Sequence, residues 1–239
     1  MSAARKRVLL SWSSGKDSAF ALHVLRGDAD VDVVGLVTTI TSVFSRVAMH
    51  AVRADVLDAQ ADAVGLPLWP VPLPWPCSNE AYEQAMSAVY ARAVGEGVEH
   101  IAFGDLFLED IRAYRERSLS ATGLRPLFPL WGRDTRALAG EMVAAGQRAV
   151  LVCVDPAALD GSFAGRDFDT ALLAELPQTV DPCGENGEFH TFAYDGPAFR
   201  HPVAHRVGEV VQRDGFVFAD VLLAEDAAGA PGTDATGSR

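Results

Sequence analysis

Residues 7–25 read RVLLSWSSGKDSAFALHVL, and this stretch decides the fold class. Its apolar start predicts a buried strand, which the small residues at positions 13–15 bring to an end. A helix is expected to begin near Asp17 and Ser18, because both residue types cap helices well. A strand, a tight turn and a helix in this order place free backbone N–H groups and the positive end of the helix dipole at one edge of a sheet. The stretch therefore predicts an anion-binding turn.

The composition of this turn suits a phosphate. Small residues at 13–15 let the backbone approach phosphate oxygens closely, and Lys16 supplies a mobile cation. Lys16 is one of only two lysines among 20 basic residues, so its position in the turn is informative. The turn is not a Walker A loop, which has Ser or Thr where Asp17 stands, and it lacks the three spaced glycines of a dinucleotide fingerprint. A plain strand-to-helix turn capped by Asp17 or Ser18 is the alternative.

Short apolar runs alternate with helical patterns along the chain. Continuous apolar runs are typical of parallel strands covered on both faces, so the alternation predicts an α/β fold with a doubly wound, Rossmann-like parallel sheet. Tyr82 and Met86 share one helical stripe, which we assign to core packing. Strands are expected at 7–12, 31–40, 100–106 and 148–155, and helices at 47–64, 79–94 and 134–146.

The pattern changes after about Asp181, where polar and apolar residues alternate as in antiparallel strands. We therefore expect a larger α/β domain over residues 1–124 and a smaller α+β domain over 125–225. Residues 226–239 are rich in Ala, Gly, Thr and Ser, a composition that predicts a disordered tail.

Composition excludes several classes of protein. The formal net charge of −12 argues against a nucleic-acid partner, because phosphate backbones need clustered cations. The three cysteines, Cys77, Cys153 and Cys183, have neither the pairing of a disulfide framework nor a metal-ligand spacing. No apolar run is long enough for a membrane span or a signal peptide. We expect a cytoplasmic protein without a membrane partner.

A second polar patch, FGDLFLEDIRAYRERSL, starts where a predicted strand ends. Open α/β sheets bind their ligands at the carboxyl ends of their strands. Gly104 would allow close approach of the backbone to a nucleotide, beside Asp105, while Asp110 and Arg112 could contact a substrate. The alternative is a helix start whose charge pairs lie on a solvated face, and we favour that interpretation for Arg115.

A third patch, DPCGENGEFHT, occupies residues 181–191. Its proline and two glycines exclude a regular helix, so Glu185 and Glu188 are expected on a tight loop that enters a strand. In the strand, Glu188 and His190 would point to the same face. Two carboxylates and an imidazole could bind Mg²⁺, take a proton from an amine or hold a cationic substrate. An acidic, solvated hairpin entrance is the alternative.

The anion-binding turn resembles the SGGxDS signature of the PP-loop ATP pyrophosphatases, which belong to the adenine nucleotide alpha hydrolase-like proteins. Ser14 stands where the signature has its first glycine, and glycine takes a positive φ more easily than serine. The resemblance implies that the turn holds the pyrophosphate end of ATP, that Asp17 binds Mg²⁺, and that Lys16 and Asp17 take part in catalysis. The residues in the positions of the signature are Ser13, Ser14, Gly15, Lys16, Asp17 and Ser18.

Taken together, the PP-loop, the FGD segment and the late CGExGEFxT segment are similar to the diphthine–ammonia ligase family. The likeness covers nearly all of the chain except the tail. It implies a ligase in which residues 1–124 bind ATP and residues 125–225 bind the substrate, with Glu185 and Glu188 as catalytic residues. The pair Ile111-Arg112 departs from the Tyr-Gln pair usual in archaeal and eukaryotic members. The arginine-rich composition indicates a bacterial relative, where the family's substrate, a modified histidine of elongation factor 2, is absent.

The resemblance implies a definite reaction. A carboxylate of a small molecule or a protein would be adenylated with release of AMP and pyrophosphate, and ammonia or another amine would form the amide. Two alternatives stay open, namely a PP-loop enzyme that adenylates an oxygen outside a carboxylate and a nucleotide-binding sensor without chemistry. The oligomeric state, including a homodimer, is also open.

Overall fold

The computed structural model describes residues 4–41, 46–47 and 52–224. The apolar run near the N-terminus forms β1 (Lys6–Ser11), the central strand of a six-stranded sheet with the order β3-β2-β1-β5-β6, in which β4 also pairs with β2. All pairings are parallel except that of β3 with β2. The other strands of this sheet are β2 (Val31–Thr41), β3 (Arg46–Val47), β4 (Leu68–Leu73), β5 (His100–Ala102) and β6 (Arg125–Leu127).

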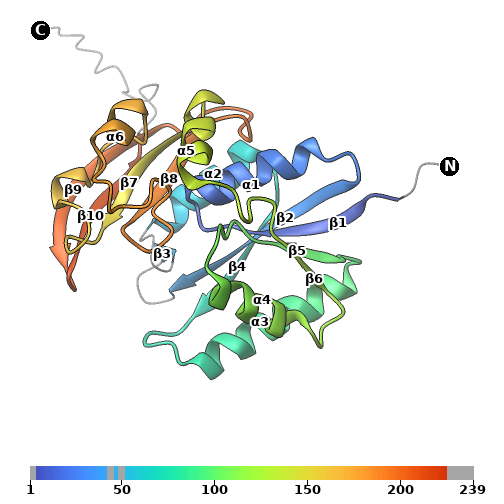
Figure 1. Cartoon of the computed structure of the whole chain (residues 1–239). Helices are drawn as coiled ribbons and strands as arrows, with labels where there is room; N and C mark the ends of the chain where they lie inside the picture. Colours follow the sequence, from blue (N-terminus) through green and yellow to red (C-terminus); the bar gives the residue numbers. More distant parts are fainter. Residues whose placement is uncertain (1–3, 42–45, 48–51, 225–239) are drawn as a thin grey trace, which may run out of the picture.

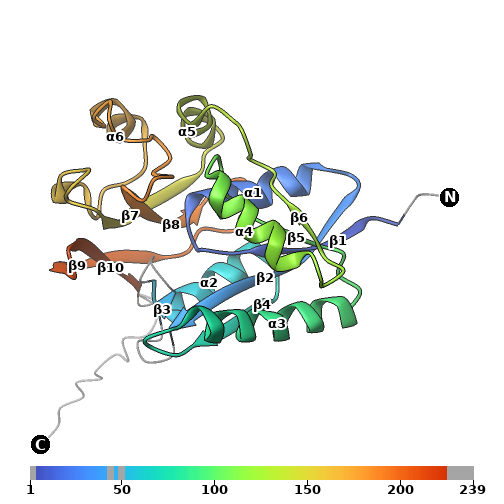
Figure 2. The same ribbon diagram turned by 60° about the horizontal axis from the view of Figure 1, so that its bottom comes forward.

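Helices cover both faces of this sheet, as the continuous apolar runs predict. Leu9 and Leu10 of β1 are fully buried and belong to different apolar clusters, because successive side chains point to opposite faces. The helices α1 and α2 pack on one face, and α3 and α4 pack on the other (Figures 1 and 2). Their bounds are α1 (Lys16–Gly27), α2 (Ala54–Val64), α3 (Asn79–Gly95) and α4 (Glu109–Leu119). The doubly wound α/β fold is confirmed.

A second, smaller sheet contains four antiparallel strands in the order β8-β7-β10-β9. It lies beside the carboxyl ends of the parallel strands (Figure 1), and α1 contacts β2 of the first sheet and β8 of the second. One apolar cluster joins Leu22 of α1 to residues of the second sheet, so the core is continuous from one sheet to the other. The elements are α5 (Thr135–Ala144), β7 (Arg148–Val154), η1 (Gly161–Phe163), α6 (Thr170–Glu175), β8 (Phe189–Asp195), β9 (His205–Arg213) and β10 (Phe216–Leu223).

The helix expected over 47–64 is shorter in the structure. It begins at Ala54, whereas Arg46–Val47 pairs with the end of β2, which supplies backbone hydrogen-bond partners in place of a helical turn. Residues 48–51, and the tail expected over 226–239, lie outside the described residues. The helix ends as predicted before Gly65, whose φ of 66° is left-handed. The division into domains at residue 124 stays a prediction.

The described helices do not meet the requirements for crossing a membrane. None of them, over residues 4–41 and 52–224, combines the length and the apolar character needed to cross a bilayer.

Candidate active site

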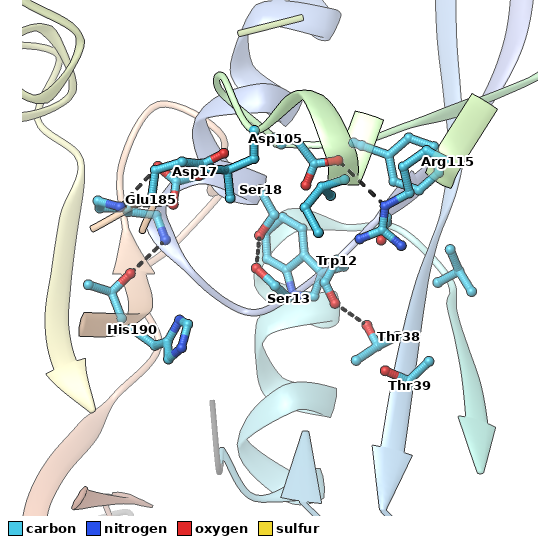
Figure 3. Close-up of a pocket in the computed structure, with 18 of the residues that line it drawn as sticks. Trp12, Ser13, Asp17, Ser18, Thr38, Thr39, Asp105, Arg115, Glu185 and His190 are labelled. Atoms are coloured by element: carbon cyan, nitrogen blue, oxygen red, sulfur yellow. Dashed lines mark hydrogen bonds and ion pairs between the residues drawn. The ribbon is translucent and has the colours of Figure 1, made fainter. Parts of the chain in front are cut away.

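A cavity of about 460 Å³ opens at the carboxyl edge of the parallel sheet. The ends of β1, β2 and β5 line one side of it, and the loop before β8 lines the other, so both sheets contribute (Figure 3). Its volume lies within the range of ligand-binding pockets. The position also matches the rule that open α/β sheets bind ligands beyond the carboxyl ends of their strands.

The predicted phosphate turn lies at this cavity. Ser13, Lys16, Asp17 and Ser18 line it, and Gly15 is the N-cap of α1. The Ser18 hydroxyl donates to the Gly15 carbonyl at 2.9 Å and lies 3.2 Å from the Ser13 hydroxyl. Ser13 donates to Ser18 and Ser18 donates to Gly15, so both hydroxyl protons are used within the turn and fix its shape beside the helix N-terminus, where an anion is favoured.

Ser14 has a φ of 69° although it carries a side chain. This is the left-handed region, which the glycine at the same place in the PP-loop signature reaches without strain. The backbone of the turn thus keeps the glycine conformation despite the substitution. Neither Ser14 nor Gly15 lines the cavity, so both lie behind the surface that a ligand would touch.

Lys16 is fixed in place, and the expectation of a mobile cation is wrong. Its side chain is 2% exposed, and its ammonium group donates to Asp17 at 2.8 Å and to the Cys183 carbonyl. The rings of Phe168 and Phe189 lie 5.5 Å from the ammonium. Burial opposes the charge, yet the Asp17 carboxylate prevails and raises the pKa of Lys16 above its ordinary value. Lys16 is therefore a stationary positive charge at the cavity wall.

The second sheet also reaches the backbone of the turn. The Lys16 N–H donates to the Thr191 hydroxyl at 3.0 Å, and the Lys16 carbonyl accepts from the Gln147 amide at 2.7 Å. One of the N–H groups predicted to be free for an anion is therefore already bonded. Thr191 lines the cavity, although sequence reasoning did not select it. Thr191 lies 175 positions from Lys16 in the sequence, so no local sequence pattern could reveal this contact.

Glu185 is the carboxylate of the late patch that faces the cavity. It accepts a hydrogen bond from the Leu106 N–H at 2.7 Å, which joins the late loop to the segment after β5. Burial raises the pKa of Glu185 to about 7, the Leu106 N–H opposes this, and the charges of Asp17 and Asp105 add to the rise. A carboxyl group that titrates near neutral pH is suited to general acid–base catalysis.

Glu188 has a different place from the one predicted. It precedes β8, does not line the cavity, and accepts hydrogen bonds from the N–H groups of Asp181 and Asn186 and from the Asn186 amide. Both carboxylate oxygens of Glu188 therefore bond to the loop before β8. The cavity is lined by His190 but not by Glu188, so the two side chains do not share one site as predicted. His190 does line the cavity, where burial and the charge of Lys16 lower its pKa to about 4. His190 is therefore neutral at pH 7.

The middle patch is divided by the helical period. Gly104 and Asp105 line the cavity, whereas Asp110 and Arg112 do not. Asp110 is exposed. Arg112 pairs with Glu116 at 2.9 Å. Successive residues on a helix point about 100° apart. Ile111 of α4 faces the cavity, so its neighbours Asp110 and Arg112 turn away from the cavity.

Arg115 reaches the cavity, and its expected place on a solvated face is wrong. It is 24% exposed, lies against the ring of Phe103, and its Nε is 3.5 Å from Asp105 Oδ2. Tyr82 and Met86, assigned to core packing, also line the cavity, as do Thr38 and Thr39 at the end of β2. The sequence signal that could have revealed the two threonines is their position near the carboxyl end of a predicted strand that neighbours the phosphate turn.

The residues fit a nucleotide with a magnesium ion. Asp105 Oδ2 and Arg115 Nε form an ion pair with each other at 3.5 Å, but neither makes a hydrogen bond among the described residues, so this buried pair keeps hydrogen-bonding capacity for a ligand. No set of three metal-binding side chains occurs in the part of the chain that the structure describes. Mg²⁺ commonly binds through one or two carboxylates together with phosphates of the substrate. Asp17, which lines the cavity and is 26% exposed, suits that role.

The loop before β8 depends on a glycine. Gly184 has a φ of 68°, and a Cβ there would lie 2.7 Å from the Phe189 carbonyl. We expect Gly184→Ala to lower the free energy of unfolding by about 2–3 kcal/mol, because strain and crowding add. Gly187→Ala is the matched control, since its φ is 91° but its Cβ would meet nothing within 4 Å. Urea unfolding measures both, and equal losses would contradict the contribution from crowding.

The chain matches two protein-family models. Residues 6–126 match the diphthamide synthase N-terminal domain, and residues 134–216 match the diphthamide synthase C-terminal domain. The diphthine–ammonia ligase of Bos taurus is 28% identical over 187 residues, which cover 72% of this chain and 70% of the bovine protein. The diphthine–ammonia ligase of Rattus norvegicus is 27% identical over 175 residues, which cover 68% of this chain and 66% of the rat protein. The Homo sapiens protein is 29% identical over 150 residues, 61% of this chain and 56% of its own length.

Proposed function

The chain belongs to the diphthamide synthase family, and on this premise we propose that it is an ATP-dependent ligase that converts a substrate carboxylate into an amide. One observation carries the proposal: a single cavity joins the phosphate turn, with Lys16 and Asp17, to Glu185. An activating end and a proton-accepting end in one cavity are what adenylation followed by amide formation needs.

In the proposed reaction ATP lies with its phosphates at the turn formed by residues 13–18. An oxygen of the substrate carboxylate attacks the α-phosphorus, the bond to pyrophosphate breaks, and an acyl-adenylate forms. Lys16 and the N-terminus of α1 hold the negative charge of the phosphates. Bound through Asp17 and the phosphates, Mg²⁺ would neutralise further charge.

The second half of the reaction uses the opposite wall. Ammonia attacks the acyl carbon, the bond to the AMP oxygen breaks, and one proton of the nitrogen passes to Glu185. The pKa of Glu185, about 7, makes the carboxylate available as a base near neutral pH. His190, neutral at this pH, can exchange hydrogen bonds with the acceptor without adding a charge.

The names of the relatives indicate diphthine, a modified protein residue, as their acceptor, and ammonia as their nitrogen donor. For this chain we propose a carboxylate of a small molecule or a protein as the acceptor. The acceptor is left open because Ile111, which stands in place of the tyrosine usual in archaeal and eukaryotic members, lines the cavity. We also propose a cytoplasmic location and no nucleic-acid partner; the net charge of −12 argues against such a partner.

Product analysis tests the reaction directly. The protein is incubated with ATP, Mg²⁺, ammonium and a panel of cellular carboxylates, and AMP, ADP and pyrophosphate are quantified. We expect AMP and pyrophosphate in equal amounts, and hydroxylamine in place of ammonium should yield a hydroxamate. Formation of ADP would exclude the chemistry. Pyrophosphate release without a hydroxamate would indicate adenylation of another oxygen, and nucleotide binding without turnover on any carboxylate would favour a sensor.

A further inference from the structure

Gln60 lies in the middle of α2, is fully buried and is 46 residues away from the phosphate turn. Its amide nitrogen donates to the Ser14 carbonyl at 2.9 Å and to the Ala193 carbonyl, and its amide oxygen accepts from the Trp12 indole N–H at 3.1 Å. We propose that Gln60 is a positioning residue that holds the turn in its nucleotide-binding conformation. The proposal rests on the proposed function, because it assumes that the turn binds ATP.

The backbone at Ser14 needs such support. Its φ of 69° is disfavoured for a residue with a Cβ atom, so the local preference of the chain acts against the turn. The Ser14 hydroxyl is buried and has no hydrogen-bond partner in the described part of the chain, so the side chain does not stabilise the conformation either. What holds Ser14 is its carbonyl, which accepts from the Ala193 N–H at 2.9 Å and from Gln60.

The orientation of one peptide group links Gln60 to the ligand. The peptide between Ser14 and Gly15 is trans, so its carbonyl and its N–H point in opposite directions. With the carbonyl held toward Gln60, the Gly15 N–H points toward the Ser13 hydroxyl, 3.4 Å away and on the cavity side. If Ser14 relaxed to a negative φ, the peptide would turn and the Gly15 N–H would no longer donate to the Ser13 hydroxyl, so this cavity-lining side chain would lose its support.

Gln60 also fixes the start of the turn. Trp12 is 1% exposed, directly follows β1 and lines the cavity. Its indole N–H donates to Gln60, so one side chain on α2 holds positions 12 and 14. A buried amide that only satisfies neighbouring polar groups would affect stability alone, whereas a positioning residue must affect nucleotide affinity as well.

Calorimetric titration with MgATP separates these roles in three variants. Gln60→Met keeps the length of the side chain and removes donors and acceptor, and Gln60→Glu keeps the acceptor for Trp12 while losing the donors to Ser14. We expect both to bind MgATP about tenfold more weakly than the unmodified protein, the size of effect expected when a buried polar partner is lost. Leu172→Ala, in the fully buried core of α6, is the control for destabilisation and should leave the affinity unchanged.

The decisive measurement is made in a Ser14→Gly background. Glycine adopts a positive φ without strain, so the turn should need less support, and Gln60→Met should then weaken binding by less than about threefold. Equal weakening in both backgrounds, or no weakening in either, would overturn the role of Gln60. An unmodified protein that does not bind MgATP would instead reject the proposed function, and the role of Gln60 with it.

Discussion

Replacing Glu185 with glutamine is expected to lower the rate of amide formation by about 10²–10⁴-fold at pH 8 with the fold intact. The amide oxygen of glutamine can still accept the Leu106 N–H, which Glu185 accepts at 2.7 Å, so the link between the two loops survives. What is lost is the group that takes the proton from the attacking nitrogen. Steady-state amide formation measures the effect, and circular dichroism checks the fold.

The pH profile distinguishes a base from a structural carboxylate. The pKa of Glu185 is raised from 4.5 to about 7, so the group is protonated below pH 7, and the rate at a fixed concentration of free, unprotonated ammonia should fall tenfold per pH unit there. A glutamine amide does not titrate in this range, so Glu185→Gln should lose this limb of the profile. Because the folded pKa exceeds the unfolded one, ionisation of Glu185 reduces stability as pH rises from 4.5 to 7, and Glu185→Gln should be more stable at pH 8 than the unmodified protein.

Glu188→Gln provides the matched comparison. Glu188 accepts bonds from the Asp181 and Asn186 N–H groups and does not line the cavity, so this variant should lose about 1–3 kcal/mol of stability and keep the acidic limb. If Glu185→Gln retained the limb, or if Glu188→Gln lost it, the assignment of the base to Glu185 would be wrong.

Replacing Lys16 with methionine is expected to reduce pyrophosphate release by at least about 10²–10³-fold, the loss typical when one preorganised charge or donor is removed from an active site. Lys16 is 2% exposed, and it supplies the ammonium that pairs with Asp17 at the cavity wall. The substitution also leaves Asp17 and the Cys183 carbonyl without this donor. We therefore expect the free energy of unfolding to fall by about 3 kcal/mol, at the lower end for a broken buried pair because Asp17 is 26% exposed.

The same substitution at Lys6 is the control. Lys6 is the chain's other lysine and is exposed at the start of β1, so Lys6→Met should change neither quantity measurably. Urea unfolding at pH 8 gives the stability, and single-turnover pyrophosphate release, measured on protein shown to be folded, gives the rate. A Lys16→Met protein with unchanged pyrophosphate release would contradict a role for this charge in ATP activation.

The sequence was informative wherever the determining forces are local. The apolar run of β1, the small residues of the turn and the capping positions of α1 depend on neighbours within a few residues, so strand, turn and helix were predictable. The left-handed Gly65 that ends α2 follows the same logic. The start of that helix was predicted wrongly, because β3 pairs with the nearby end of β2, Ile40 with Val47 and Thr41 with Arg46, and an apolar pattern alone does not distinguish such a strand from a helical turn.

The sequence by itself determined the doubly wound fold and the patches that supply the cavity, because hydrophobic periodicity and turn chemistry act along the chain. Only the tertiary structure decided which side chains of those patches meet. Glu185 faces the cavity, whereas Glu188 is hydrogen-bonded within its own loop. Arg115 lines the cavity although a solvated face was expected, and Asp110 lies outside the cavity. The tertiary structure also placed Gln60 behind the phosphate turn. Such choices depend on which distant donors and charges are buried together, and contacts across more than 40 residues have no trace in local pattern.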